Sequence, residues 1–338
     1  MTLRLSVLDQ STIVEGRDPA SSIRESIALA QHAEALGYAR YWCAEHHASA
    51  GQAGTAPEIL IAAIAMVTDR IRVGSAGVML PHYASLKVAE QFRVLEGLAP
   101  GRIDLGLGRA PGSDYRTARA LNPLADQAAD HFPEQVRDLR DWLAGTPLIE
   151  GHPFRDIVCQ PSGPTVPEMW ILGSSDYGAQ VAAYFGLPFC FAAFITDGAG
   201  LAHAFDLYRE GYRPSARHPA PYASACVWAL AAESEAEAER QVSSRAILRL
   251  WRDQGRFAAL PSPEAAIAAR DQLTAAERAR YEQHRTRALH GTGPAVAEAL
   301  RQLADEHRLD EIAVLTTMHD AEARRRSYAL LAAAAGLS

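Results

Sequence analysis

Residues 71–108 read IRVGSAGVMLPHYASLKVAEQFRVLEGLAPGRIDLGLG, and this stretch decides the fold class. It begins with an apolar run over 71–80, which is typical of a buried strand. The residues that follow carry one apolar helix face, at Val88, Phe92, Leu95 and Ala99. After the turn at Pro100-Gly101, residues 103–107 alternate with the period of a second strand. A strand, a helix and a strand in this order predict two parallel neighbours in one sheet.

The same alternation continues along the whole chain. Strand patterns occupy eight places, at residues 3–9, 40–43, 71–80, 103–107, 170–172, 188–193, 223–231 and 312–315. Helix patterns lie between and after them, at residues 22–36, 56–67, 88–99, 131–144, 179–185, 201–212, 294–303 and 320–335. Eight repeats of this kind predict an α/β protein of the (β/α)8 TIM-barrel class. In such a barrel the carboxyl ends of the strands meet at one mouth, where sites are built.

Two segments depart from the repeat, and we expect both to be additions to a single domain over residues 1–338. Residues 151–168 hold four prolines and are predicted to be an excursion. Residues 233–290 are rich in Ala, Glu and Arg and are predicted to form two or three polar helices at the rim of the barrel. The first helix is expected to begin with a capping box formed by Ser22 and Glu25.

A doubly wound open sheet is the rival architecture, and its strongest sign would be a glycine fingerprint after the first strand. That strand ends in Asp9-Gln10-Ser11 instead. The near match at residues 106–111 follows the fourth strand and has proline in place of the third glycine. The sequence therefore favours the barrel.

Composition excludes several classes of function. The chain has 338 residues, of which 48% are hydrophobic and 22% charged, as in an ordinary globular protein. A net charge of −7 gives no general attraction to nucleic acid or to an anionic membrane, so we expect neither as a partner. No apolar run approaches the roughly 20 residues that span a bilayer, and the N-terminus leads into a strand pattern rather than a secretory signal. The four scattered cysteines indicate buried thiols in a reducing cytoplasm.

Glu45-His46-His47, after the strand at 40–43, is the candidate for acid/base chemistry. An imidazole titrates near neutral pH and can move a proton during a reaction, so His46 is the candidate catalytic group. Zinc binding is a competing interpretation, but neither HExxH nor another spaced ligand set is present, and we expect no metal. The structural alternative is that both histidines are hydrogen-bonded residues at the start of a loop.

Small residues and a cation follow the next two strands. Ser75-Ala76-Gly77 interrupt an apolar strand, which indicates either close approach to a flat object or simple barrel packing. Arg109 comes directly after Gly106-Leu107-Gly108, where its planar guanidinium would suit a phosphate. An ion pair of Arg109 with Asp104 or Asp114 is the structural alternative.

The turn from Gly173 to Gly178 ends one strand and begins a helix. Such a turn offers free backbone N–H groups, the positive end of the helix dipole and the hydroxyls of Ser174 and Ser175 to an anion. An ordinary serine N-cap is the alternative. A nucleophile elbow is excluded because Tyr177 stands where the second glycine of Gly-x-Ser-x-Gly must be.

Six stretches together carry a family pattern. They are Tyr41-Trp42-x-x-Glu45-His46-His47, residues 72–81, Ala89-Glu90-Gln91, residues 101–109, Ser174-Ser175 ahead of residues 182–188, and Arg326-Ser327-Tyr328-x-Leu330-Leu331. Across nearly its whole length the chain resembles the bacterial-luciferase-like flavin monooxygenases. The resemblance implies a (β/α)8 barrel, reduced FMN supplied by a separate flavin reductase, and O2 as co-substrate with a small organic molecule. A homodimer is also expected from the resemblance.

The resemblance also implies roles for single residues. By position, His46 is similar to the catalytic histidine of the family. The Ala76–Gly77 bond is similar to a non-proline cis peptide that lies against the flavin ring. Arg109, Ser174, Ser175 and Gly178 match the phosphate contacts, and Asp9 and Gln10 would line the floor of the pocket.

Two departures from the family leave the substrate open. Residues 193–197 lack a histidine-containing turn of the nearest subgroup, and residues 233–290 are divergent. A deazaflavin-dependent dehydrogenase is kept as an alternative to the monooxygenase because the resemblance implies a fold that such enzymes share. A non-catalytic flavin-binding relative is the third alternative.

Overall fold

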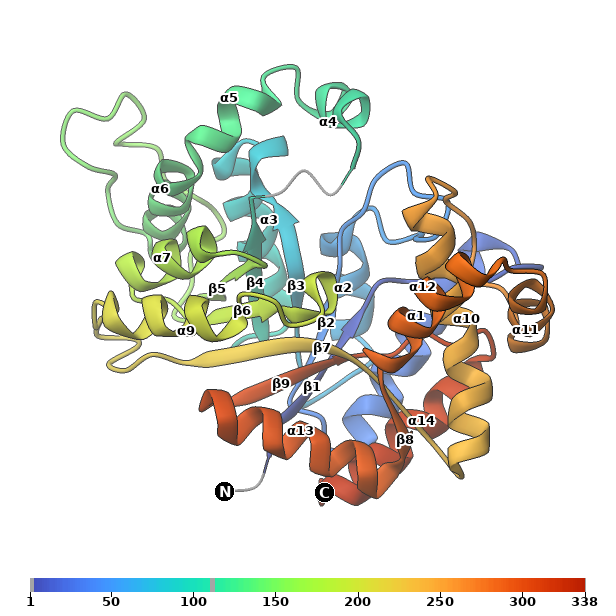
Figure 1. Ribbon diagram of the computed structural model, residues 1–338. Helices are drawn as coiled ribbons and strands as arrows, with labels where there is room; N and C mark the ends of the chain where they lie inside the picture. Colours follow the sequence, from blue (N-terminus) through green and yellow to red (C-terminus); the bar gives the residue numbers. More distant parts are fainter. Residues whose placement is uncertain (1–2, 110–112, 338) are drawn as a thin grey trace.

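A closed parallel barrel forms the centre of this computed structural model, which describes residues 3–109 and 113–337 (Figure 1). Its strands are β1 (Leu5–Asp9), β2 (Arg40–Cys43), β3 (Arg72–Met79), β4 (Ile103–Gly108), β5 (Glu168–Gly173), β6 (Phe189–Ala192), β7 (Ala223–Ala232) and β9 (Glu311–Leu315). They pair in the order β1–β2–β3–β4–β5–β6–β7–β9, and β9 pairs with β1 to close the ring. Every pairing is parallel, so the eight predicted strands and the (β/α)8 class are confirmed.

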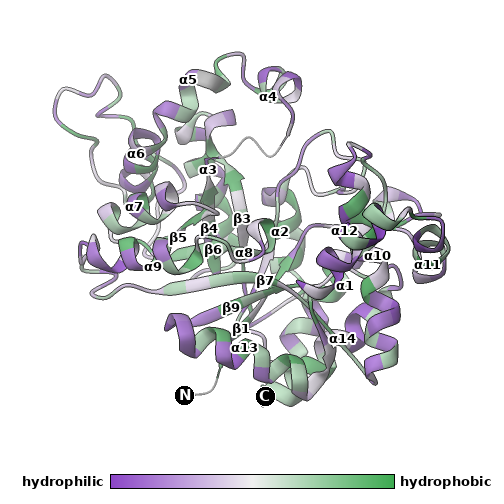
Figure 2. Ribbon diagram, viewed as in Figure 1, coloured by the Kyte–Doolittle hydropathy of each residue, from purple (hydrophilic) through white to green (hydrophobic). Residues whose placement is uncertain are grey.

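Helices surround the barrel and connect its strands. They are α1 (Pro19–Ala35), α2 (Pro57–Ala65), the short 3-10 helix η1 (Leu80–His82), α3 (Ser85–Leu98), α4 (Tyr115–Leu121), α5 (Ala125–Asp130), α6 (Phe132–Ala144), α7 (Asp176–Phe185), α8 (Ala193–Thr196), α9 (Leu201–Glu210), α13 (Gly293–His307) and α14 (Ala321–Ala335). Within the described ranges, no helix is long and apolar enough to cross a bilayer. Figure 2 shows hydrophobic residues on the strands and hydrophilic residues over much of the outer helix surface.

The segment between β7 and β9 adds three helices and one strand at one side of the barrel. The helices are α10 (Glu235–Asp253), α11 (Pro263–Asp271) and α12 (Ala275–Thr286). The strand is β8 (Leu289–Thr292), which pairs with the carboxyl end of β7, at Ala229–Ala232, and with no other described strand. Two or three helices were predicted here, and the structure has three. Strand β8 was not predicted, because four residues with two polar side chains give no strand period.

The predicted capping box at the start of α1 is wrong. Helix α1 begins one turn earlier, because the Asp18 side chain accepts a hydrogen bond from the Ala20 N–H and Pro19 occupies the first helical position. Ser22 lies inside the helix, where its hydroxyl donates to the carbonyl of Thr12. An Asp-Pro start therefore takes precedence over the Ser-x-x-Glu pattern.

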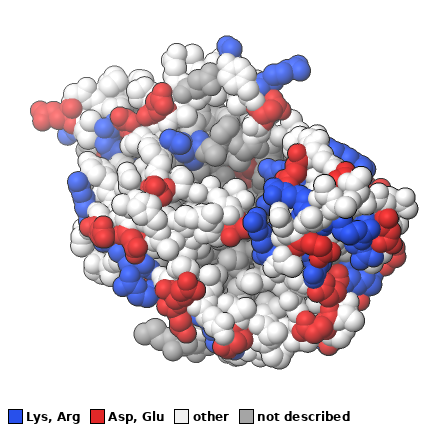
Figure 3. Space-filling model, viewed as in Figure 1, with Lys and Arg blue, Asp and Glu red and all other residues white. Residues whose placement is uncertain are grey.

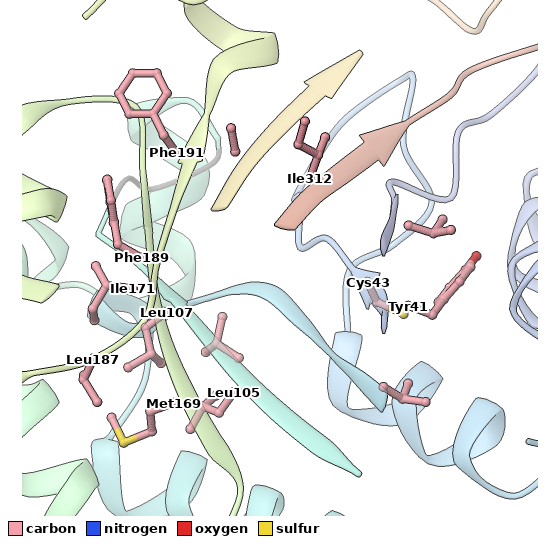
Figure 4. Close-up of a cluster of buried hydrophobic side chains, with 14 of the residues drawn as sticks. Tyr41, Cys43, Leu105, Leu107, Met169, Ile171, Leu187, Phe189, Phe191 and Ile312 are labelled. Carbon is pink, nitrogen blue, oxygen red and sulfur yellow. The ribbon is translucent and has the colours of Figure 1, made fainter. Parts of the chain in front are cut away.

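The outward faces of the strands pack against the helices. Figure 4 shows this layer: Leu105 and Leu107 of β4, Met169 and Ile171 of β5, and Phe189 and Phe191 of β6 lie side by side. The alternate residues of the same strands face the lumen of the barrel. All four cysteines are buried free thiols, as the sequence indicated.

Candidate active site at the mouth of the barrel

The lower end of the lumen is closed by an ion cluster. Arg40 lies 2.8 Å from the carboxylate of Asp104 and 3.2 Å from that of Glu311. The indole of Trp42 donates to Asp104, and the hydroxyl of Tyr222 donates to Glu311. Arg40, Asp104 and Glu311 are almost completely buried, so this end of the barrel is a packed plug rather than an opening.

Above the plug, the lumen is aromatic and apolar. Trp42 and Trp170 are in edge-to-face contact with ring centroids 4.9 Å apart. Leu8, Cys190 and Cys226 pack with them, and Trp228 lies in the same buried cluster. The space that remains is therefore at the carboxyl ends of the strands, and Figure 3 shows a hollow at the centre of this face.

Glu45 and His47 form a hydrogen-bonded support at the end of β2. The Glu45 carboxylate accepts hydrogen bonds from the Tyr83 hydroxyl at 2.7 Å and from the Met79 backbone N–H at 3.2 Å. It also lies 2.7 Å from Nε2 of His47. The structural interpretation is therefore correct for His47, which is fixed by Glu45.

His46 has a different environment. Its backbone N–H donates to the carbonyl of Gly54, which fixes the residue, but its Nδ1 is buried and has no hydrogen-bond partner within the described part of the chain. Burial lowers the pKa of His46 from 6.5 to about 4, helped by the charge of Arg252 and opposed by Glu45. The imidazole is thus neutral at pH 7, with one ring nitrogen available to a ligand. A buried polar atom without a partner is an expected feature of a binding site that is complete only with its ligand.

This pKa gives a testable dependence of stability on pH. Between pH 6.5 and 4 the unfolded chain binds a proton at His46 that the folded chain does not bind, so stability is full above pH 6.5 and falls as the pH falls. We expect the contribution of His46 to drop by roughly 2–3 kcal/mol between pH 7 and pH 4.5. Urea unfolding of the wild type and His46→Gln at both pH values measures it, since only the wild type should show this extra loss. Equal losses in the two proteins would show that the pKa is not depressed.

Ala76 and Gly77 form a flat stretch on the strand next to β2. The Ala76–Gly77 peptide bond is cis, as predicted, and the pairing of β3 with β4 is irregular between Ser75 and Val78. A Cβ added at Gly77 would lie 2.6 Å from Cδ1 of Leu172 and 2.7 Å from the carbonyl oxygen of Gly106. Backbone thus approaches backbone so closely that position 77 accepts only glycine.

Arg109, which follows β4, lies against the start of α7, which follows β5. Its guanidinium carbon lies 4.1 Å from the centroid of the Tyr177 ring, in the first turn of α7. The two ion pairs considered for Arg109 are not formed: Asp104 belongs to the lumen plug, and Asp114 caps α4 through Thr117. Among the residues that the structure describes, Arg109 has no carboxylate partner.

The N-terminus of α7 has no side-chain cap. Ser175 occupies the N-cap position, but its hydroxyl accepts no hydrogen bond from the helix, so the alternative of an ordinary serine N-cap is wrong. Gly178 is buried, and a Cβ added there would lie 3.4 Å from the Cα of Gly173 and would also contact Phe189. Glycine at this position therefore lets the turn pack tightly on β6. Free N–H groups, two serine hydroxyls and the Arg109 guanidinium together fit a phosphate group.

Asp9 and Gln10, both expected at the floor of the pocket, have different outcomes. The prediction that Asp9 lines the floor of the pocket is wrong. Its carboxylate is buried beneath α14, where it accepts a hydrogen bond from the Tyr41 hydroxyl at 2.7 Å and pairs with Arg324 at 2.8 Å. Like Leu5 and Val7, it faces the helix layer rather than the lumen. Gln10 is next in the alternation and stays a prediction for the floor.

Sequence reasoning missed a group of arginines at the mouth. Arg245, Arg249 and Arg252 lie on one face of α10, and Arg245 stacks on the lumen residue Trp228 at 4.6 Å. Their spacing of four and three residues was a readable signal within residues 233–290. This spacing did not predict a site, because a charged face of a helix is normally exposed to solvent.

A model of the family described as luciferase-like monooxygenase matches residues 3–310. A luciferase-like monooxygenase of Escherichia coli (strain K12) is 40% identical over 333 residues, which cover 97% of this chain and 96% of the relative. An N-acetyl-S-alkylcysteine monooxygenase of Bacillus subtilis (strain 168) is 35% identical, with 97% of each chain covered.

Two solved structures extend this result. The crystal structure of apo-MsnO8 superposes with a TM-score of 0.90 at 38% identity and covers 99% of both chains. The oxygenating constituent of 3,6-diketocamphane monooxygenase from Pseudomonas putida, solved in complex with FMN, superposes with a TM-score of 0.71 at 16% identity and covers 98% of this chain and 97% of that one. The second likeness shows the fold alone.

Proposed function

This chain belongs to the luciferase-like monooxygenase family, and from that premise we propose that it binds reduced FMN at the mouth of its barrel and oxygenates a small organic substrate with O2. The flavin phosphate is assigned to Arg109, Ser174, Ser175 and the backbone at Gly178. The flavin ring is assigned to the flat stretch at Ala76–Gly77, with His46 beside it.

One observation carries this proposal: the Arg109 guanidinium, which has no carboxylate partner in residues 3–109 and 113–337, lies over Tyr177 at the uncapped N-terminus of a ten-residue helix. A cation without a carboxylate partner among the described residues and a free helix terminus both favour an anion, and FMN carries a dianionic phosphate. The FMN complex of the diketocamphane enzyme supports the choice of flavin, because that protein has the same fold. The N-acetyl-S-alkylcysteine monooxygenase supports a small organic substrate.

The residues of the mouth have separate tasks in this proposal. Reduced FMN, when bound, would supply the electrons that activate O2. His46 is neutral at pH 7, so it would accept a proton from the flavin or the substrate at its free ring nitrogen. Glu45 holds the adjoining loop through His47 and Tyr83 and so keeps His46 in place. The aromatic lumen below would exclude water from the reacting atoms.

Oxygen uptake by the purified protein tests this function. The protein is mixed with FMN, NADH, a general flavin reductase and a panel of thioethers, ketones and aldehydes, each with and without a carboxylate group. We expect substrate-dependent formation of an oxygenated product that needs both proteins. Hydride transfer from a reduced deazaflavin without O2 uptake would support the dehydrogenase instead. Tight FMN binding without turnover on any of these compounds would support the non-catalytic flavin-binding protein.

We place the protein in the cytoplasm as a single domain of 338 residues, since its four free buried thiols suit a reducing compartment. A separate flavin reductase would meet it only transiently, because reduced FMN can diffuse between the two.

We further propose a homodimer through α2 and α3. A groove of about 510 Å³ lies between these helices, away from the barrel mouth, and is lined by Ile59, Val94 and Leu98. These three side chains are 70%, 49% and 48% exposed, so the face is apolar and open in the single chain. Exposed apolar faces of this kind are typical of protein interfaces.

Light scattering after gel filtration should therefore give twice the chain mass of 36.5 kDa. The double variant Ile59→Asp/Val94→Asp should shift the protein to a monomer, because two carboxylates would be buried at the interface. Phe154→Asp, on an exposed loop residue, is the control and should remain dimeric. A monomeric wild type would refute the dimer.

A further inference from the structure

A row of three arginines follows one face of α10. Arg245, Arg249 and Arg252 are separated by four and three residues, which places their side chains above one another on the helix. We call these three residues the arginine row. Neither the flavin nor the proton chemistry proposed above uses it.

The arginine row borders the barrel mouth. The guanidinium of Arg245 stacks on Trp228, whose indole N–H donates to Thr317 just beyond the carboxyl end of β9. Arg249 donates to the backbone carbonyl of Phe194, at 3.5 Å, on the helix that follows β6. Arg252 contributes to the depressed pKa of His46 at the end of β2. In Figure 3, Lys and Arg side chains gather over α10 and α12 at one edge of the central hollow.

The positive charge of this wall is not balanced within the described residues. Asp197 is the one carboxylate there within 4 Å of Arg245 or Arg249, at 3.8 and 3.7 Å, and it is shared with Arg287 at 3.3 Å. The distances from the arginine row are too long for hydrogen bonds. Asp253, at the end of α10, is already paired with Arg280 and His284. The guanidinium groups of Arg245, Arg249 and Arg287 therefore share the single carboxylate of Asp197.

The charge of Arg245 is costly to bury in this position. Its side chain is 7% exposed, and its one close hydrogen bond among the described residues is to the backbone carbonyl of His284 at 3.1 Å. Burial, together with the charge of Arg249, lowers the pKa of Arg245 to about 10. A buried cation with so little compensation becomes more favourable when an anion enters beside it.

We propose that the substrate is an organic carboxylate, held by Arg245 and Arg249 with its apolar part against Trp228 and Phe194. This inference rests on the flavin-dependent function proposed above and specifies its substrate class. A guanidinium presents parallel N–H groups that match the two oxygens of a carboxylate. The aromatic and apolar lumen residues beside the arginine row suit an attached carbon chain. The flavin phosphate has its own cradle at Arg109, so the two anions occupy different walls of the mouth.

Calorimetric titration of the FMN-loaded protein tests this assignment without measuring turnover. The probes are butanoate, octanoate and phenylacetate, with octanamide as the uncharged match for octanoate and inorganic phosphate as a bare anion. We expect at least one carboxylate to bind, and octanamide and phosphate to bind at least about tenfold more weakly, as for the loss of a charged hydrogen bond or of the apolar contact. Arg249→Gln should weaken carboxylate binding roughly tenfold to a hundredfold.

Arg240→Gln is the matched control. Arg240 is on the same helix but nine residues from Arg249, hence on the opposite face, where it pairs with Glu237 and Glu264. It should bind the carboxylate like the wild type. Because Arg245→Gln can disturb folding, the half-buried Arg249 carries the test, with the melting temperature measured for each variant.

The possible outcomes separate the two proposals. If FMN binds but none of the three carboxylates does, the carboxylate assignment is wrong and the flavin site stands. Equal binding of octanoate and octanamide, or of octanoate and phosphate, also overturns it. An unchanged carboxylate affinity in Arg249→Gln overturns the role of the arginine row. Failure of the wild type to bind FMN in either the oxidised or the reduced form would instead refute the proposed function.

Discussion

His46→Gln should lower turnover by on the order of 10²–10⁴ while FMN still binds with nearly wild-type affinity. The substitution keeps the size of the side chain and removes the neutral imidazole, whose buried Nδ1 has no partner in the described residues. If this nitrogen accepts a proton during the reaction, the loss falls on the chemical step and not on flavin binding. Single-turnover rates with prebound reduced FMN, together with a fluorescence titration of FMN, measure the two effects separately.

His47→Gln is the matched control for this prediction. It makes the same chemical change one residue further on, at a histidine that is hydrogen-bonded to Glu45. We expect a lower stability but a single-turnover rate within a small factor of the wild type. A His46→Gln enzyme with an unchanged single-turnover rate would remove His46 from the chemistry. Equal slowing by both substitutions would mean that His46 acts only through the structure of the loop.

Arg109→Gln should weaken FMN binding roughly tenfold to a hundredfold, because a charge-assisted hydrogen bond to the phosphate is lost. The affinity for riboflavin, which lacks the phosphate, should not change. The ratio of the two dissociation constants therefore isolates the phosphate contact from any general damage to the pocket. Fluorescence titration of both flavins against the wild type and the variant gives this ratio.

Arg301→Gln, on the exposed side of α13, should leave both flavin affinities unchanged. If Arg109→Gln weakens FMN and riboflavin equally, Arg109 supports the fold of the mouth and does not contact the phosphate. If neither affinity changes, the phosphate lies elsewhere.

The fold could be predicted from the sequence because its elements repeat with clear periods. Strand β4 alternates over Ile103–Gly108, and α13 (Gly293–His307) has Pro294 in its first turn and one apolar face, so both were found close to where the structure has them. Helices α4 and α5 were missed because they are short and mostly exposed, and they form no continuous apolar face. Strand β8 exists only by pairing with the long end of β7, which local sequence cannot reveal.

The candidate site could be predicted in part. Strand order places β2, β3, β4 and β5 side by side, as the expected convergence of the residues that follow them requires. Arg109, after β4, does contact Tyr177, after β5. The sequence could not separate His46 from His47, because the difference arises from Tyr83 and Met79, more than 30 residues away along the chain. It also misplaced Asp9, since an aspartate at the end of a strand can face either layer and here its partner Arg324 lies in the last helix.

A crystal structure of the protein with FMN tests the central claim most directly, namely that His46, Ala76–Gly77, Arg109 and the start of α7 form one flavin site. The flavin phosphate should lie within hydrogen-bond distance of the Arg109 guanidinium and of the Ser175 hydroxyl. The ring should rest on the Ala76–Gly77 peptide with His46 at its edge. A flavin bound on any other part of the molecule, or with its phosphate turned away from α7, would contradict the account.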